Sequence, residues 1–509
     1  ELAEHKLLLW KPEIPTAGAH PERRLRARLL RIEDCEAKQR ALGLLDELEA
    51  ARDHVARSAG DVARLGDALD ALDATFERIT GRDASRNAGR TYAARSIAYE
   101  DTRRDVTVEI GRRVLDRLGP PMVLLLEAAR WFTHESARAH RALFATIHAE
   151  LRAARGTAEI DFLDFLEALL PELGDQFTVS RTMRGVVDRL HAIWGDLLAV
   201  RGDETGRVHR TAAQLRDGVR ERFAAPGPGW PSARYHTPDI MLAARGPEAL
   251  ARGELYGVLG EIVVGDHTYS RPLFLKLHPD GEAWIRARFA DLGPIVAPVE
   301  AAARALRSDH QPPVPEDLDL EVGDGLSWRA RDQVFAAGEL VVAPAGADLI
   351  VCTRDRRRSF DIVECFDMYL QLTTSSHFSL LPRAPHVPRL TIDELVVVRE
   401  SWHFQPEQLE FCRVEPGQRF LAARAFARAH GLPRFVFARV PQEPKPWFVD
   451  FASPLYVEIL AKLCRKATSL SISEMLPSIE ECWLPDADGR LYTSELRIAA
   501  VDPRRCSLP

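Results

Sequence analysis

The sequence predicts an α+β fold in which a helix-rich first part is followed by a mixed-sheet α/β second part. Two patterns support this prediction. Apolar residues recur at three- and four-residue spacing through much of residues 32–224, as in amphipathic helices. After residue 231, short runs rich in β-branched residues alternate with helical patterns. The proline- and glycine-rich stretch 226–231 separates the two patterns, so we expect a helix-rich portion over 1–225 and a mixed α/β portion over 232–509.

Helices dominate the expected first part. The pattern is helical from about residue 32 to residue 79, and further amphipathic stretches lie near 122–154, 160–172, 182–200 and 208–224. One short strand is expected at 97–99. His134 and Glu135 begin a sequence similar to the zinc-binding HExxH motif, but position 138 is arginine. Because that motif requires two histidines one helical turn apart, we exclude a zinc site of this type.

The second part combines expected strands with two or three helices. Residues 253–264 are expected to form a hairpin, and 480–498 two strands joined by an Asp-Gly turn. Ser471 and Glu474 have the spacing of a capping box at the start of a short helix. Helices are expected over 416–431, with Gly431 as C-cap, and from Ser453 to about residue 465. Further strands are expected at 240–242, 340–343, 349–352, 360–363, 435–440 and 447–451.

The stretch 388–402, PRLTIDELVVVRESW, has the apolar, β-branched centre of a largely buried strand. Arg389 precedes this centre and Arg399 follows it. An unpaired guanidinium is costly to bury, so both arginines are expected near solvent, an anion or a carboxylate partner. Structural ion pairs and an anion site both satisfy that requirement. Trp402 is expected in the core.

Two other segments gather arginines. The loop 353–358 holds four of them, which suits either a phosphate contact or a solvated hairpin tip. Residues 89–111 interleave aromatic side chains with arginines and acids, as in a polar pocket or a surface ion-pair network. Since the chain has 61 arginines among its 68 basic residues, any anion site is expected to be an arginine site.

Composition and missing motifs restrict the function. With 46% hydrophobic and 28% charged residues and a net charge of −7, the sequence is that of an ordinary globular protein. The seven cysteines are scattered, and neither a signal peptide nor an apolar run of ~20 residues is present, so we expect a cytoplasmic protein without a membrane span. No Walker A, GxSxG or Rossmann motif occurs, and we expect no cofactor and no metal.

Several segments resemble the glutamylation domain of the lantibiotic dehydratases. Tyr92, Arg95, Tyr99, Glu100 and Asp101 match the family's YxxRtxxYED segment. The stretch 388–402 resembles another family segment, and so does the order LPRFVFARVP, KPWFVDFASPLYVEIL, SEMLP and DGRLYTSELRI towards the C-terminus. The resemblance covers the middle and late parts of that domain. A further N-terminal block and a C-terminal elimination domain of the family are not found, so we expect a split or partial dehydratase.

The resemblance implies a transferase that takes glutamate from glutamyl-tRNA and esterifies Ser and Thr hydroxyls of a precursor peptide with its leader, in lanthipeptide or thiopeptide biosynthesis. Aminoacyl-tRNA would be the co-substrate, a separate protein could carry the elimination domain, and a homodimer is compatible with the family. By resemblance, Asp101, Arg95 and Arg389 are the expected catalytic residues. The residues expected to bind substrate or tRNA are Tyr92, Tyr99, Arg104, Arg271 and Arg399.

Two alternatives stay open at this point. A peptide aminoacyl-tRNA ligase, which adds an amino acid to a peptide C-terminus, shares the same resemblance. A catalytically silent peptide-binding scaffold would keep the fold without the chemistry. The sequence does not distinguish them from the transferase, nor does it identify the peptide, the tRNA or the oligomeric state.

Overall fold

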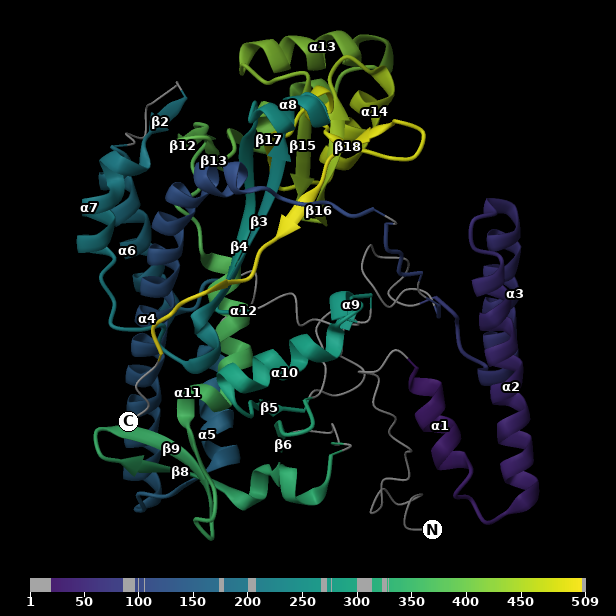
Figure 1. The fold of residues 1–509 in the computed structure, drawn as a ribbon, viewed down its shortest axis with the longest axis vertical. Helices are drawn as coiled ribbons and strands as arrows, with labels where there is room; N and C mark the ends of the chain where they lie inside the picture. Colours follow the sequence, from purple (N-terminus) through teal and green to yellow (C-terminus); the bar gives the residue numbers. More distant parts are fainter. Residues whose placement is uncertain are drawn as a thin grey trace.

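The computed structural model has helices and mixed sheets in an α+β arrangement, as predicted (Figure 1). The helix-rich segments come first and most strands follow them. The structure describes residues 20–85, 97–98, 100–104, 106–173, 178–199, 207–266, 272–275, 277–299, 314–322, 327 and 329–505.

The predicted helical stretch 32–79 consists of two helices, α2 and α3, that pack side by side. The chain reverses between them at residues 58–61, where Gly60 has a φ of +91°. Asp34 and Asp61 cap the two helices by accepting hydrogen bonds from the N–H groups of Ala37 and Arg64. The bounds of the first three helices are α1 (Pro21–Leu29), α2 (Cys35–Arg57) and α3 (Val62–Thr80).

The 44-residue helix α4 (Arg112–Arg155) is the longest element and runs behind the central sheet (Figure 1). The helices predicted near 160–172, 182–200 and 208–224 are also present, slightly shorter than expected. The strand predicted at 97–99 is wrong for Ile97 and Ala98, which are not in a strand, while Tyr99 lies outside the described residues. The helices that follow α4 are α5 (Phe162–Leu169), α6 (Arg181–Leu198) and α7 (Ala212–Arg222).

A seven-stranded sheet occupies the centre of the molecule, with the order β2-β12-β13-β4-β3-β20 and with β21 also paired to β3. The stretch 388–402 does contribute to this mixed sheet, but the prediction of one continuous strand is wrong. Asp393, with a φ of +48°, forms a turn that folds the stretch into the hairpin β12–β13. This hairpin lies between β2 and β4 and pairs parallel with both. The strands are β2 (Val208–Arg210), β3 (Tyr235–Ala243), β4 (Tyr256–Val264), β12 (Leu390–Ile392), β13 (Leu395–Val398), β20 (Glu495–Arg497) and β21 (Ala500–Val501).

Residues 253–264 do not form a hairpin by themselves. They contain the single strand β4, which pairs antiparallel with β3 across the short helix α8 (Pro247–Arg252). The segment between β4 and the sheets that follow contains α9 (Pro272–Leu275) and α10 (Gly281–Leu292).

A five-stranded sheet of order β11-β14-β17-β15-β16 lies beside the central sheet, together with α13 and α14. The short helix predicted from Ser471 and Glu474 is wrong: these residues are in β17, which pairs with β14 and β15. Pairing on both edges outweighs the local capping-box pattern. The elements are β11 (His386–Val387), β14 (Ser401–Phe404), α13 (Pro416–Ala429), β15 (Phe435–Val440), β16 (Glu443–Asp450), α14 (Pro454–Cys464) and β17 (Leu470–Glu474).

Three smaller sheets complete the described strands. The strands predicted at 340–343 and 349–352 are present as β8 and β9, whereas the strand predicted at 360–363 ends at Asp361 and continues as helix α11. The C-terminal strand–turn–strand is β18–β19, followed by β20. The elements are β1 (Ile160–Asp161), β5 (Val296–Pro298), β6 (Leu318–Glu321), β7 (Val334–Ala336), β8 (Leu340–Ala345), β9 (Asp348–Thr353), β10 (Ser359–Asp361), α11 (Ile362–Cys365), α12 (Asp367–His377), β18 (Leu484–Pro485) and β19 (Leu491–Tyr492).

The largest hydrophobic core fills the space between α4, α6, α7 and one face of the central sheet. It includes Leu125 and Leu190 from the helices and Ile240, Leu395 and Val397 from the strands. The core therefore joins segments on both sides of the breaker at 226–231, even though the secondary structure changes there.

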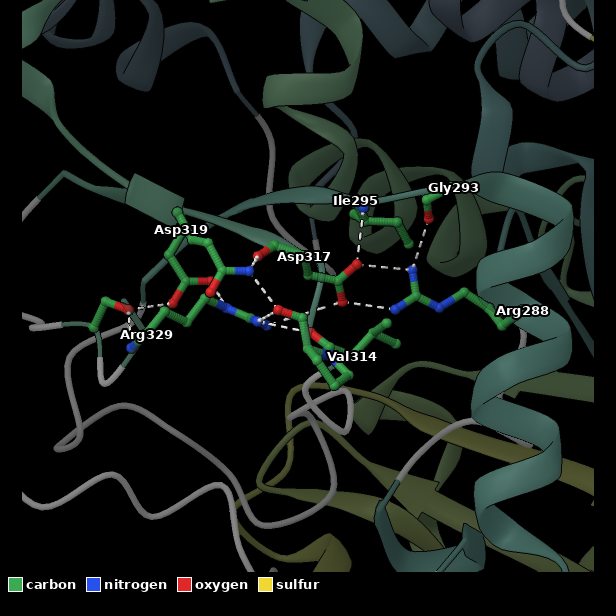
Figure 2. Close-up of polar contacts among 10 residues, drawn as sticks. Arg288, Gly293, Ile295, Val314, Asp317, Asp319 and Arg329 are labelled. Atoms are coloured by element: carbon green, nitrogen blue, oxygen red, sulfur yellow. Dashed lines mark hydrogen bonds and ion pairs between the residues drawn. The ribbon is translucent and has the colours of Figure 1, made fainter. Parts of the chain in front are cut away.

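A buried ion-pair network connects α10 to the sheet β5–β6–β7 (Figure 2). Arg288, 3% exposed, donates to both carboxylate oxygens of Asp317 at 3.1 and 2.6 Å. Arg329 donates to Asp319 at 2.9 Å and to the carbonyl oxygen of Val314 at 2.7 Å. Since these charges are paired and hydrogen-bonded, their burial is tolerated.

Candidate functional site

One face of the central sheet carries polar groups instead of the main core, and we call it the site face. Strand pairing defines it: Glu495 lies opposite Met241, and Arg497 lies opposite Asp239. Met241 also lies opposite Val258 of β4. Because residues directly across a sheet share a face, these side chains all project to one side. The residues between them, such as Ile240, point into the main core.

Arg389 lies at the start of the β12–β13 hairpin and forms a two-pronged ion pair with Glu474 of β17. Its Nε donates to Oε1 of Glu474 at 2.8 Å, and its Nη2 donates to Oε2. The Glu474 side chain is 4% exposed and that of Arg389 19%. This is the structural ion pair that the sequence left open, so an anionic ligand would have to compete with Glu474 for the same guanidinium.

Arg399, at the end of β13, is bound differently. Its Nη1 donates to the carbonyl oxygen of Leu259 at 3.0 Å, and its Nη2 donates to that of Leu476 at 3.1 Å. The Nε atom is buried and has no acceptor among the described residues. Burial lowers the pKa of Arg399, partly opposed by the charge of Glu474. A buried guanidinium held only by neutral carbonyl groups retains the capacity to bind an anion.

Glu474 and Tyr256 link the two arginines. The Tyr256 hydroxyl donates to Oε2 of Glu481 at 2.8 Å, and burial followed by this contact raises its pKa. Arg389 and Glu474 act electrostatically on Tyr256, and Tyr256 and Glu474 act on Arg399. The structure thus brings Arg389 and Arg399 into one charged cluster, although their hydrogen-bond partners differ.

Asp239 is a site-face residue that the sequence analysis did not single out. It is 2% exposed, and its Oδ2 lies 3.2 Å from Nη2 of Arg497. Burial raises the pKa of Asp239 to about 7, with Glu495 and Glu261 adding to the effect and Arg497 opposing it. A carboxyl group with a pKa near neutrality can accept and return a proton at working pH. Its place in the apolar strand YHTPDIML, where aspartate is disfavoured, was the available signal.

The segment 100–104 carries two more predicted site residues. Arg104 lies over the Tyr492 ring, 5.0 Å from its centroid, next to the β18–β19 hairpin. Asp101 is partly buried. Four predicted site residues lie outside the described residues: Tyr92, Arg95, Tyr99 and Arg271. Their convergence with Arg389 therefore stays a prediction.

The arginine-rich loop 353–358 connects β9 and β10, and three of its arginines are engaged with carboxylates. Arg354 pairs with Asp161, Arg356 with Glu159, and Arg357 with Asp355. These side chains are half-exposed or more, as expected for a solvated hairpin tip.

Within the described ranges, no three His, Cys, Asp or Glu side chains are grouped to hold a metal ion. None of the helices described here combines the length and apolar character needed to cross a membrane.

Comparison with known proteins identifies the fold. No protein-family model matches the sequence, and no curated protein matches it. The structure is similar to the glutamylation domain of TbtB from thiomuracin biosynthesis, with a TM-score of 0.53 and 16% identity over 93% of this chain and 62% of that chain. TbtB bound to 5′-phosphodesmethylglutamycin matches with a TM-score of 0.52 and 16% identity, over 96% of this chain and 64% of that one.

A third match is MibB, a tRNA-dependent lantibiotic dehydratase from Microbispora sp. 107891, with a TM-score of 0.61 and 16% identity. It covers 94% of this chain and 48% of MibB. The chain thus spans between 48% and 64% of the length of these three proteins. Nearly all of the chain therefore has the fold of the lantibiotic dehydratases and their glutamylation domain, as the sequence resemblance predicted.

Proposed function

We propose that this chain transfers glutamate from glutamyl-tRNA to Ser and Thr hydroxyls of a ribosomally made precursor peptide, as a split or partial dehydratase. The observation that carries the proposal is the fold it shares with TbtB and with MibB, whose name includes tRNA dependence. The underused guanidinium of Arg399 adds local support, because glutamyl-tRNA offers both carboxylate and phosphate groups.

In the proposed reaction, the Ser or Thr oxygen bonds to the glutamyl carbonyl carbon, and the bond from that carbon to the terminal ribose oxygen of the tRNA breaks. The hydroxyl proton passes to Asp239 and then to the departing ribose oxygen. Asp239 suits this role because its pKa of about 7 lets it take up and release a proton near neutral pH. Arg399 would hold the glutamate carboxylate or an acceptor-end phosphate.

The aminoacyl ester is already activated, so positioning and proton transfer supply the remaining chemistry. We therefore propose that neither a metal nor a nucleotide triphosphate is required once glutamyl-tRNA is formed. The proposed partners are glutamyl-tRNA, a precursor peptide with its leader and a separate elimination-domain protein, and the proposed compartment is the cytoplasm.

The test combines the purified protein with glutamyl-tRNA that carries radiolabelled glutamate and with Ser/Thr-rich peptides. Label that becomes attached to the peptide through an alkali-labile ester supports the proposal. Label in an alkali-stable amide at the peptide C-terminus would instead identify a ligase. Absence of both transfer and preferential binding of the acylated tRNA would refute the proposal and favour the silent scaffold.

The variant Arg399→Met should lose binding of acylated tRNA by roughly ten-fold or more, as for a lost charge-assisted contact. Arg40→Met is the matched control, because Arg40 is 70% exposed on α2 and pairs with Glu36. Thermal unfolding of both variants separates loss of binding from loss of structure.

A further inference from the structure

A second basic site lies away from the site face, in a cavity of about 560 Å³ between α4, α7 and the C-terminal segment. Figure 1 shows this last segment running across α4 towards the C-terminus. Three arginines from these three elements line the cavity: Arg130, Arg220 and Arg504. The volume is in the range of small-molecule sites, which hold ligands of several hundred Å³.

The three guanidiniums are only partly satisfied by the protein. Arg130, 13% exposed, lies 3.4 Å from Oδ2 of Asp502, but its Nε is buried without an acceptor in the described part of the chain. Arg504 donates through Nη1 to the neutral carbonyl oxygen of Ala225. Arg220, in the last turn of α7, has no ion-pair or hydrogen-bond partner among the described residues.

Charge balance indicates the ligand. The lining contains three arginines and one carboxylate, Glu127, so it carries two net positive charges. No oxygen of Glu127 lies within 4.0 Å of these guanidiniums among the described ion pairs. Like charges that converge without a counter-charge repel one another, and a bound dianion removes that repulsion. Phe223, Ala225 and Pro226 add an apolar wall, which suits an organic group attached to the anion.

We propose that this cavity binds a dianionic phosphate monoester. Guanidinium forks match the geometry of phosphate oxygens and bind them in pairs of hydrogen bonds. The carboxylate of Glu127 provides an acceptor for a hydroxyl group of the same ligand. The site is separate from the site face, so this inference does not depend on the proposed transferase activity.

The test measures binding of glycerol phosphate and inorganic phosphate to the full chain by calorimetry. Arg220→Gln and Arg504→Gln should each weaken binding by roughly ten-fold or more, the usual effect of losing a charged hydrogen-bond pair. The matched control is Arg216→Gln, since Arg216 is exposed on the same helix and does not line the cavity. Because Arg220 has no protein partner among the described residues, its replacement should leave thermal unfolding unchanged.

The pH dependence gives a second readout. A phosphate monoester gains its second charge near pH 6, so binding should strengthen between about pH 5 and 7. Sulfate is dianionic throughout that range, and its binding should stay constant. A 5′-phosphorylated trinucleotide that binds more tightly than glycerol phosphate would identify a nucleic-acid end as the source of the monoester, and the opposite order a small metabolite.

Three results would overturn the proposal. The first is absence of saturable binding of phosphate and glycerol phosphate. The second is binding that Arg216→Gln weakens as much as Arg220→Gln does, because only net charge would then matter. The third is a dinucleotide with an internal phosphodiester alone binding as tightly as the monoester, because a single negative charge would then suffice.

Discussion

Separating Arg389 from Glu474 should destabilise the protein strongly, and removing both should not. The variants are Arg389→Met, Glu474→Met and the double variant. In Arg389→Met the Glu474 carboxylate, 4% exposed, loses both prongs of its ion pair. It keeps one printed donor, the backbone N–H of Glu400 at 2.8 Å. One hydrogen bond does not replace the lost counter-charge.

The expected magnitudes follow from this geometry. Breaking a buried ion pair by removing one partner typically costs about 3–5 kcal/mol in the free energy of unfolding. The partial exposure of Arg389, 19%, places its removal near the lower end, at about 3 kcal/mol. The double variant removes both charges and leaves the Glu400 N–H without its acceptor, so it should lie within about 1–2 kcal/mol of the parent.

Urea unfolding followed by circular dichroism measures these differences. An unfolding free energy for Arg389→Met within about 1 kcal/mol of the parent would refute the structural role of the pair. So would a double variant no more stable than Arg389→Met. Arg389→Lys keeps the charge but loses the two-pronged geometry, so it should lower the melting temperature more than it changes aminoacyl-tRNA binding. The reverse result would return Arg389 to the anion site.

Three further predictions concern other buried charges. Arg288→Met should cost about 3–5 kcal/mol in urea unfolding because it leaves Asp317 unpaired, whereas Arg286→Met, at a 72% exposed position, should cost under about 1 kcal/mol; equal effects would contradict the network's role. Burial raises the pKa of Glu364 to about 7, so the folded protein is most stable when this group is protonated and loses that stability as pH rises from about 4.5 to 7. Glu364→Gln should therefore gain on the order of 1–3 kcal/mol at pH 8 and little at pH 4, and a gain independent of pH would contradict this. If Asp239 accepts the hydroxyl proton, the transfer rate should rise with pH and level off above about 7, and Asp239→Asn should be at least ~100-fold slower with a flat profile; an unchanged profile would remove Asp239 from the mechanism.

The central sheet could be predicted only in part from the sequence. The apolar residues of 390–398 correctly indicated buried strand, because β-branched side chains favour the pleated interior. The turn within them was missed, since Asp393-Glu394 lacks the Asn-Gly or Asp-Gly pair that usually marks a tight hairpin. The capping-box spacing of Ser471 and Glu474 misled for the opposite reason: a local signal was overridden by pairing to strands from elsewhere.

The candidate site was harder to predict, because its interactions join distant positions. Nothing near Arg389 in the sequence identifies Glu474 as its partner, and the pair distinguishes Arg389 from Arg399. Both arginines look alike as residues flanking an apolar run. Only the fold shows that one meets a carboxylate and the other meets backbone carbonyl groups.

The position of the β12–β13 hairpin between β2 and β4 also constrains how the chain folds. Both neighbouring strands precede the hairpin in the sequence, and both pair with it in parallel. While residues 390–398 are still being synthesised, β2 and β4 have unpaired edges that can associate with other chains. Contacts across such long separations also form slowly. Completion of the sheet is therefore a late step of folding, and nascent chains that stop before the hairpin should need chaperones to avoid aggregation.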